Sequence, residues 1–222
     1  MLRYLDVQNI LDKNDLILQE SGCVGSENER GNTYMKKIGI VTDSHSSISQ
    51  EEAEKLGIFV LPMPFYIDGE CFYESVTLSR ELFFEKLAAG ADITTSQPSP
   101  TAVMEIWDKA LEQFEKILYL PISSGLSGSY ETAMMLAKDE AYEGRVLVVD
   151  DGQVAAPLHQ MVLDAMDMIE KGYEAEQIRD LLERAGDRMM IYIALQTLEC
   201  LKKGGRVTPA AAALGSVFNI KP

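Results

Sequence analysis

Short apolar runs alternate with segments of helical spacing along most of the chain. Residues 37–41, 117–120 and 145–149 are rich in Ile, Leu and Val and are bounded by polar or turn-forming residues, which is typical of buried strands. Each run leads through a polar loop into a stretch whose apolar residues recur at helical spacing. Because strands that alternate with helices form parallel sheets, the pattern predicts an α/β fold, with an open, mostly parallel sheet and helices on both faces.

Caps and turns predict the elements between these runs. Ser49 and Ser79 each stand at the start of a segment with helical spacing, as N-cap residues do. Residues 58–65 read as a strand interrupted by prolines, which favours an edge or irregular position. Asp68-Gly69 favours a hairpin turn. Further helices are expected over residues 154–171, 174–185, 198–203 and 210–218, and a further strand over 189–195.

The serine loop, which we define as residues 123–129, follows the strand at residues 117–120 and precedes a helix. Its residues are mostly small, and most of them carry hydroxyl groups. A strand that leads through such a loop into a helix presents free backbone N–H groups and the positive end of the helix dipole at one place, which favours an anion. The alternative is that Ser127 or Ser129 only caps its own helix, as serine commonly does.

Two other hydroxyl-rich loops occupy comparable positions. Residues 94–100 follow a short apolar stretch and precede a helix, and Pro100 suits the first helical position. Residues 42–47 follow the strand at residues 37–41. Because the loops at the carboxyl ends of parallel strands meet at one edge of the sheet, we expect the three loops to share one rim.

The composition is that of a folded, acidic protein. The chain has 222 residues, of which 46% are apolar, and a net charge of −15 at pH 7. This charge argues against nucleic acid and anionic membrane surfaces as partners, because both attract basic patches. It also means that local dipoles and hydroxyl groups, and not the overall charge, would have to hold an anionic ligand.

Several absences in the sequence restrict the cellular setting and the chemistry. No apolar run is long enough to span a membrane and no secretion signal is visible, so a cytoplasmic location is expected. Cys23, Cys71 and Cys200 are too widely spaced for a zinc site or a disulfide framework, and we expect buried free thiols. The two histidines lie far apart, so no metal site is expected.

Six short motifs occur along the chain in one order. They are VTDSHSSI, TTSQPSP, SSGLSGSY, VVDD, LKKGGR and IKP. In these motifs the chain, from about Met35 to its end, resembles the DegV family, bacterial fatty-acid-binding proteins that include the acyl-carrying subunit of fatty acid kinase. The resemblance implies that the anion is the carboxylate of a long-chain fatty acid.

The same resemblance assigns roles to particular residues. Thr95 and Ser127 would hold the carboxylate, and Ser96 and Ser124 would assist. Arg206 would lie in the headgroup region and contact the kinase. The catalytic subunit of fatty acid kinase would convert the bound acid to an acyl phosphate for phospholipid metabolism. The chain would then be a carrier subunit and not an enzyme, with a bound fatty acid as ligand and no cofactor.

Two segments fit the family pattern less simply. Family members usually have a serine after the first aspartate of the fourth loop and glycines further on, whereas this chain has Asp151 and Pro157. Residues 202–206 also suit a solvated helix end, where lysines complement the dipole and glycine stops the helix. Arg206 fits that alternative less well, because a guanidinium after two glycines can bind a carboxylate through two hydrogen bonds.

The predicted domain organisation has three parts. Residues 1–34 are expected to be a disordered extension, with a short amphipathic helix possible at residues 2–18. Residues 36–185 would form the α/β domain. Residues 186–222 would begin a second α/β domain that covers the lipid in family members, and its remaining strands are not in this sequence. We therefore expect a truncated product or an incomplete sequence.

Two other functions fit parts of the sequence. A serine hydrolase is suggested by the strand-to-helix turn at Ser127, followed along the chain by Asp150 and His159 in the order of an α/β-hydrolase triad. The second glycine of that motif is replaced by Ser129, which weakens this alternative. His45 is expected at the rim of the site and not as a base. The third possibility is a truncated interaction protein that binds no lipid.

Overall fold

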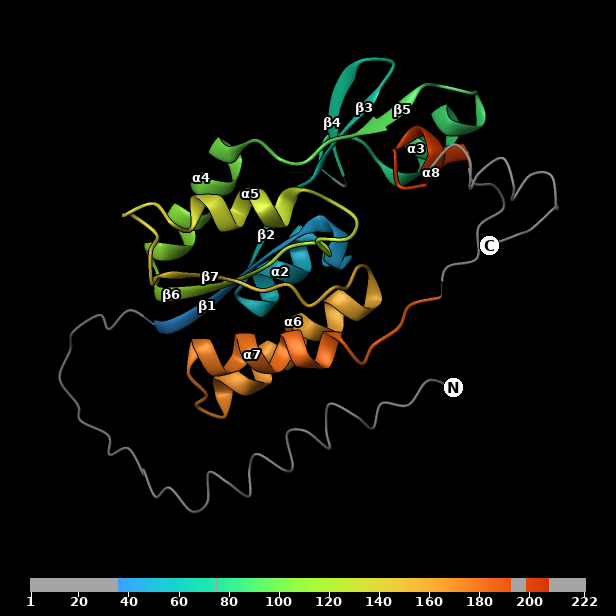
Figure 1. Ribbon diagram of the computed structural model, residues 1–222. Helices are drawn as coiled ribbons and strands as arrows, with labels where there is room; N and C mark the ends of the chain where they lie inside the picture. Colours follow the sequence, from blue (N-terminus) through green and yellow to red (C-terminus); the bar gives the residue numbers. More distant parts are fainter. Residues whose placement is uncertain (1–35, 75, 193–198, 208–222) are drawn as a thin grey trace. The chain divides into compact units, whose positions relative to one another are not determined.

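The described part of the chain is built around a parallel sheet (Figure 1). The computed structural model describes residues 36–74, 76–192 and 199–207. The sheet has the order β2-β1-β6-β7, and all three pairs of neighbours are parallel. Its strands are β1 (Lys36–Asp43), β2 (Phe59–Leu61), β6 (Phe114–Leu120) and β7 (Val146–Val148).

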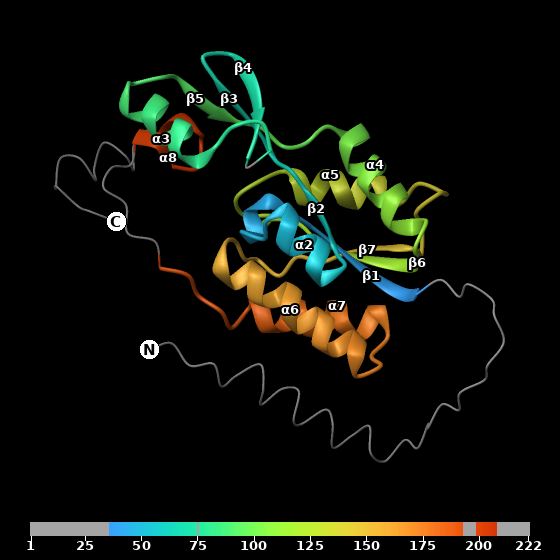
Figure 2. The ribbon, with the colours of Figure 1, turned by 180° about the vertical axis from the view of Figure 1, so that it is seen from behind.

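Helices cover both faces of this sheet (Figures 1 and 2). In Figure 1, α4 (Pro100–Leu111) and α5 (Ser129–Leu136) lie above the sheet, whereas α6 (Ala156–Glu170) and α7 (Ala175–Gly186) lie below it. The central strands are apolar because they face helices on both sides. The predicted α/β fold, with a mostly parallel sheet between helices, is therefore confirmed.

The apolar core on the α4 side contains a cluster of aromatic rings. Trp107 of α4 is fully buried, and its ring centroid lies 5.4 Å from that of Tyr119 and 5.3 Å from that of Tyr142. Both pairs have the edge-to-face geometry that aromatic rings favour. This cluster fixes α4 on the sheet and so helps to position the loops at the carboxyl ends of the strands.

A second sheet is antiparallel. Its order is β4-β3-β5, with β3 (Pro64–Ile67), β4 (Glu70–Tyr73) and β5 (Ile93–Thr95). The turn between β3 and β4 has positive φ at both Asp68 (51°) and Gly69 (85°), as a two-residue hairpin turn with the twist of its strands requires. The predicted hairpin turn is confirmed.

Two predictions about this region are wrong. Residues 58–65 do not form one interrupted strand, because the segment with Pro62 separates β2 from β3. Strand β2 does have the predicted edge position, in the parallel sheet, whereas β3 is the central strand of the antiparallel sheet. Thr95 does not follow a strand of the parallel sheet. It ends β5 and pairs with Phe65 across the antiparallel sheet. Between β2 and β3, Pro62 marks the change of sheet, because proline lacks the amide hydrogen that pairing in a sheet requires.

Serine caps begin three helices, two of them as predicted. Ser49 accepts a hydrogen bond from the amide of Glu52 at the start of α2 (Gln50–Leu56). Ser79 and Ser99 cap α3 (Arg80–Ala88) and α4 in the same way, each through the amide three residues further on. These contacts satisfy amides that the helix itself leaves unpaired, and they fix where each helix begins.

The C-terminal predictions are tested only in part. Helix α8 (Glu199–Lys203) is present within the predicted range 198–203. Residues 189–192 are not a strand, and the rest of the strand predicted over 189–195 lies outside the described residues. The extension at residues 1–34 and the helix over 210–218 also lie outside them, and the proposed domain boundary after residue 185 stays a prediction.

The prediction of buried thiols fails at the one cysteine whose side chain is described. Cys71 on β4 is an exposed free thiol. Strand β4 is at the edge of the antiparallel sheet and its residues are mostly exposed, so a position on it gives little burial. The side chains of Cys23 and Cys200 lie outside the described residues.

Candidate functional site

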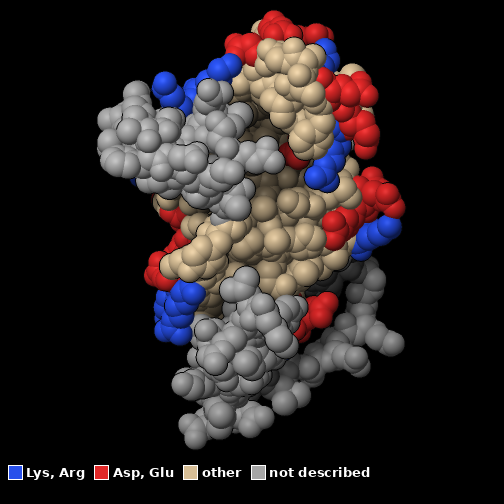
Figure 3. Space-filling model, turned by 90° about the vertical axis from the view of Figure 1, so that its right-hand side faces the viewer, with Lys and Arg blue, Asp and Glu red and all other residues tan. Residues whose placement is uncertain are grey.

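A cavity of about 580 Å³ brings together residues from both sheets. This volume lies in the range of small-molecule sites in proteins. The lining includes apolar side chains, which we call the apolar wall: Ile48, Val60, Met63, Phe65, Phe83 and Ile93. Figure 3 shows that the described surface is hollowed among residues that are mostly uncharged. Such a wall removes apolar ligand surface from water, which is the main source of affinity for a long hydrocarbon chain.

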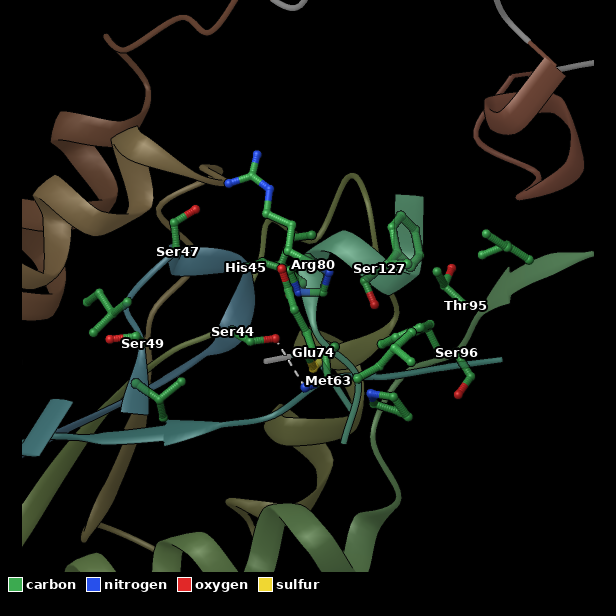
Figure 4. Close-up of a pocket in the computed structure, with 18 of the residues that line it drawn as sticks. Ser44, His45, Ser47, Ser49, Met63, Glu74, Arg80, Thr95, Ser96 and Ser127 are labelled. Atoms are coloured by element: carbon green, nitrogen blue, oxygen red, sulfur yellow. Dashed lines mark hydrogen bonds between the residues drawn. The ribbon is translucent and has the colours of Figure 1, made fainter. Parts of the chain in front are cut away.

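The polar lining contains four of the five site residues predicted from the sequence. Thr95, Ser96, Ser127 and Arg206 all line the cavity. Figure 4 shows the first three together with Ser44, Ser47 and Ser49, which also line it. Ser124 is not among the lining residues, and its amide donates to Asp150 at 3.3 Å instead. The three hydroxyl-rich loops therefore do contribute to one cavity, although Thr95 comes to it from the antiparallel sheet.

The serine loop uses most of its backbone amides internally, which the sequence analysis did not predict. The amides of Leu126 and Ser127 donate to the carbonyl of Ser123, at 3.0 and 3.2 Å. The amides of residues 123, 124, 125 and 129 also have partners within the protein. The expected cradle of open amides is therefore wrong for these residues. Four of the amides donate to carbonyl or hydroxyl groups of the loop itself, and those of Ser123 and Ser124 donate to Gln153 and Asp150. Its side-chain hydroxyls are the groups left to meet a ligand.

Ser127 and Ser129 form a hydroxyl pair at the start of α5. Their Oγ atoms lie 2.7 Å apart, and the amide of Ser129 donates to Ser127 Oγ at 3.3 Å. The N-cap residue of α5 is Gly128, which makes no side-chain cap. Neither serine is therefore the N-cap, although Ser127 does accept from the first amide of the helix.

Ser96 differs from Thr95 and Ser127 in the direction of its hydroxyl. Its Oγ donates to the carbonyl of Gln97 at 3.1 Å. Figure 4 shows this hydroxyl apart from those of Thr95 and Ser127. Of the residues predicted to hold an anion, Thr95 and Ser127 therefore have the more suitable placement.

Arg206 is attached to the serine loop. Its Nε donates to the carbonyl of Leu126 at 3.1 Å, and its Nη1 donates to the carbonyl of Gly204. The guanidinium therefore lies beside Ser127 in space, although 79 positions separate the two in the sequence. An arginine carries its charge at all physiological pH values, so it supplies a fixed positive charge at the rim of the cavity.

Asp43 connects the loop at residues 42–47 with Ile122, the residue before the serine loop, and this contact was not predicted from the sequence. Its side chain is fully buried at the end of β1. Oδ2 accepts the amide of Ile122 at 2.8 Å, whereas Oδ1 accepts the amide of His45 at 2.9 Å and lies 3.2 Å from His45 Nδ1. Because Ile122 is 79 positions away, no local pattern could indicate this contact.

His45 belongs to the short helix η1 (Ser44–Ser46) and lines the cavity. Burial lowers the pKa of its imidazole, but the hydrogen bond to Asp43 and the charges of Asp43 and Glu74 raise it more, so that the pKa is raised overall. The charge of Arg206 acts in the opposite direction. The prediction that His45 lies at the rim agrees with its partial exposure, since 34% of its side chain is accessible.

Comparison with known proteins connects this arrangement with one family. Residues 37–222 match the family model described as an uncharacterised protein of the DegV family. The chain belongs to the DegV family. The resemblance seen in the sequence motifs is thus confirmed, over 186 of the 222 residues.

Individual relatives support the family assignment. The chain is 31% identical to a DegV domain-containing protein of Caldanaerobacter subterraneus, over 85% of this chain and 67% of that protein. It is 36% identical to one from Deinococcus radiodurans, over 83% of this chain and 66% of the relative. The chain therefore spans about two thirds of the length of these DegV proteins.

Three solved structures, two of them described as DegV family proteins, have the same fold. A DegV family protein from Thermus thermophilus, described by its fatty acid binding, has a TM-score of 0.74 and 35% identity over 84% of this chain and 66% of its own. A fatty acid binding DegV family protein from Streptococcus agalactiae has a TM-score of 0.73 and 25% identity, over 84% and 66% of the two chains. A stearic acid-binding protein from Eubacterium ventriosum has a TM-score of 0.66 and 26% identity, over 80% and 64%.

The hydrolase triad considered from the sequence is not assembled by the contacts of this DegV chain. His159 Nε2 lies 3.4 Å from Glu52 Oε1, and Asp150 Oδ1 accepts the amide of Ser124. The hydroxyl of Ser127 is paired with Ser129. Each of the three proposed triad residues thus has a partner outside the triad.

The loop in which the chain departs from the family pattern holds a buried carboxyl group. Asp151 Oδ1 accepts the amide of Gln153 at 2.9 Å, whereas its Oδ2 is buried without a hydrogen-bond partner among the described residues. Burial is the main cause that raises the pKa of Asp151 to about 7, and the charges of Asp150 and Asp43 add to it. Asp151 is not a lining residue of the cavity.

Two further expectations concern absences. Among the residues that the structure describes, no group of three or more His, Cys, Asp and Glu side chains is placed to hold a metal ion. Within the same part of the chain, no helix has both the length and the apolar character needed to cross a membrane.

Proposed function

We propose that this chain binds a long-chain fatty acid, with the hydrocarbon chain against the apolar wall and the carboxylate near Thr95 and Ser127. The observation that carries the proposal is one cavity whose lining combines apolar side chains with hydroxyl groups and a guanidinium. DegV proteins of known structure that are described as fatty acid binding share this fold, which supports the same ligand class here.

The two parts of the cavity contribute differently to binding. Removal of a methylene from water contributes about 0.8 kcal/mol, so a long acyl chain contributes on the order of 10 kcal/mol before the costs of association. A hydrogen bond to a charged carboxylate contributes about 1.5 to 3 kcal/mol. The apolar wall therefore supplies most of the affinity, and the hydroxyl groups set the direction in which the acid lies.

The position of the carboxylate suits presentation to a second protein. Thr95 is exposed and Ser127 is partly exposed, whereas Phe65 on the apolar side is buried. A carboxylate held at Thr95 and Ser127 would lie near the surface, within reach of the catalytic subunit of a fatty acid kinase. The kinase would form the acyl phosphate from ATP in the cytoplasm, and Arg206 would contact it at the rim.

The lipid content of the purified protein tests the binding proposal. Mass spectrometry of an organic extract is expected to show a fatty acid in about equimolar amount. Thr95→Val, which keeps the shape of the side chain but removes the hydroxyl, is expected to weaken binding of an added fatty acid about tenfold. Thr94→Val on the same strand is the matched control, because Thr94 does not line the cavity. An extract without lipid and no uptake of added acid would instead support a non-binding interaction protein.

Two assays separate carrier from enzyme. A serine-directed phosphonate should leave Ser127 unlabelled, and covalent labelling would favour the hydrolase. With a fatty acid kinase, ATP and hydroxylamine, the loaded chain should yield an acyl hydroxamate, because hydroxylamine displaces phosphate from an acyl phosphate. Fatty acid binding without hydroxamate would leave the carrier function standing but would contradict presentation to that kinase.

A further inference from the structure

We infer that His45, oriented by Asp43, is a charge-bearing residue of the carboxylate site and makes fatty acid binding depend on pH. This inference rests on the proposed function and adds a residue to it. His45 lines the same cavity as Ser127 and Thr95 (Figure 4). None of the motif residues considered for the anion from the sequence carries a charge that changes near neutral pH.

The contact with Asp43 decides which ring nitrogen faces the ligand. A carboxylate can only accept hydrogen bonds, so the Nδ1 atom that lies 3.2 Å from Asp43 Oδ1 carries a proton. The opposite nitrogen, Nε2, is then left for the cavity. In the neutral ring Nε2 has a lone pair and repels a carboxylate, whereas in the imidazolium it is a donor and binds one. Protonation therefore changes His45 from an unfavourable to a favourable neighbour of the anion.

Asp43 is held firmly enough to orient the ring. Its side chain is fully buried, and its other oxygen accepts the amide of Ile122 at 2.8 Å. The backbone on either side of His45 is also fixed. The amide of Met63 donates to Ser44 Oγ at 3.1 Å, and the amide of Ala155 donates to the carbonyl of His45 at 2.7 Å. The ring thus stands on a short helix that contacts from three other segments hold in place.

Several charged groups around the ring act on its charge, whereas Asp151, with a pKa that burial raises to about 7, does not line the cavity. Glu74 and Asp43 favour the imidazolium, and Arg206 opposes it. Arg80 of α3 also lines the cavity, but both arginines keep their charge throughout the range of interest. Helix α6 packs against η1, and its His159 faces Glu52 and does not line the cavity. The raised pKa of His45 places its loss of charge at a higher pH than that of a free imidazole.

The test measures binding of radiolabelled palmitic acid by equilibrium dialysis between pH 6 and 8.5, at concentrations below its aggregation. For the unaltered chain we expect the affinity to fall as the pH rises through the pKa of His45, by at most tenfold per pH unit. His45→Gln keeps a donor for Asp43 but has no charge. It is expected to bind about tenfold more weakly at pH 6 and to lose the pH dependence. His45→Lys keeps a positive charge over the whole range and is expected to bind well at pH 8.5.

Controls separate this inference from the proposed function. Hexadecanol, which has no charge, should bind all three proteins without a change between pH 6 and 8.5. Equal urea midpoints of the three proteins would show that the substitutions leave the fold intact. If the unaltered chain and His45→Gln bind palmitic acid with the same pH dependence, the role of His45 is wrong while fatty acid binding stands. If the unaltered chain binds palmitic acid at no pH, the proposed function fails as well.

Discussion

The hydroxyl oxygens of Ser127 and Ser129 lie 2.7 Å apart, and only the first of these residues lines the cavity. Ser129 is 2% exposed at the start of α5, and its amide also donates to Ser127 Oγ. When the Ser129 hydroxyl donates as well, both acceptor positions of Ser127 Oγ are filled and its own proton is free for a carboxylate. Ser129 is therefore a positioning residue for Ser127 in the proposed site.

Substitution of these two serines should separate orientation from affinity. Ser127→Ala is expected to weaken fatty acid retention only about tenfold, because the apolar wall is unchanged, but to reduce acyl phosphate formation by the kinase more strongly. Ser129→Ala should show the same imbalance to a smaller degree. For each variant, the amount of retained fatty acid and the yield of acyl hydroxamate are measured on the same preparation, and the two losses are compared. Ser124→Ala, outside the cavity, is the control, and equal losses in both assays would contradict the orienting role.

The length of the acid should set the affinity. Each methylene removed from a saturated acid is expected to raise the dissociation constant about fourfold, since a methylene contributes about 0.8 kcal/mol. Dialysis with acids of decreasing length measures this dependence, and the corresponding alcohols provide a series without the carboxylate. Equal affinity for short and long acids would show that the apolar side of the cavity does not hold the chain.

Asp151 should make stability depend on pH. Its pKa is raised from 3.8 to about 7 in the folded state, so folding opposes its ionisation. The folded state then binds more protons than the unfolded state between these values. Stability is accordingly lost as the pH rises from about 4 to 7, and the full cost is present above that range. Asp151→Asn should be more stable than the unaltered chain at pH 8, by on the order of 1 to 3 kcal/mol.

Urea unfolding at pH 5 and pH 8 measures this effect. The gain from Asp151→Asn should be larger at pH 8, because the unaltered carboxyl is mostly neutral at pH 5 in the folded state. Asp187→Asn, at an exposed position next to the end of α7, is the matched control and should show no such gain. An equal change at both pH values would contradict a cost that comes from the charge of Asp151.

Gly186, the last residue of α7, lies against the same loop. A Cβ atom at this position would come 1.9 Å from the backbone oxygen of Asp151, and the carbonyl of Gly186 accepts Gln153 Nε2 at 3.1 Å. Gly186→Ala is therefore expected to destabilise the chain by about 1 to 3 kcal/mol or more, because neither backbone can move freely. Gly125→Ala is the control, since its nearest neighbour would be Ser123 Oγ at 3.5 Å. The urea midpoints of the two variants measure the difference in stability. Similar midpoints for Gly186→Ala and Gly125→Ala would contradict the clash.

Local features of the fold could be predicted well from the sequence. Ser49 caps its helix and Asp68-Gly69 makes its turn through contacts within a few residues, so their residue types alone indicate the structure. The choice of sheet at Thr95 could not be predicted in this way. It depends on pairing with Phe65, which is 30 positions earlier in the chain.

The candidate site shows the same division. Ser127 and Thr95 could be selected because hydroxyl-rich loops stand out in the sequence. The hydrogen bonds of serine-loop amides to Ser123 could not be predicted, because they depend on how the loop folds. The position of Asp43 could not be predicted either, because it depends on a contact with the distant amide of Ile122. An aspartate at the end of an apolar strand is the one sequence feature that could have drawn attention to Asp43.

The chain passes between the two sheets at two places, and each crossing contains prolines. The first contains Pro62 and leads to Pro64, and the second contains Pro98 and leads to Pro100. A proline has a nearly fixed φ, so each crossing has few conformations to choose from. We therefore expect the distance between the two sheets to be the same with and without a ligand. The width of an acyl chain, which a cis double bond or a methyl branch increases, would then decide which fatty acids fit.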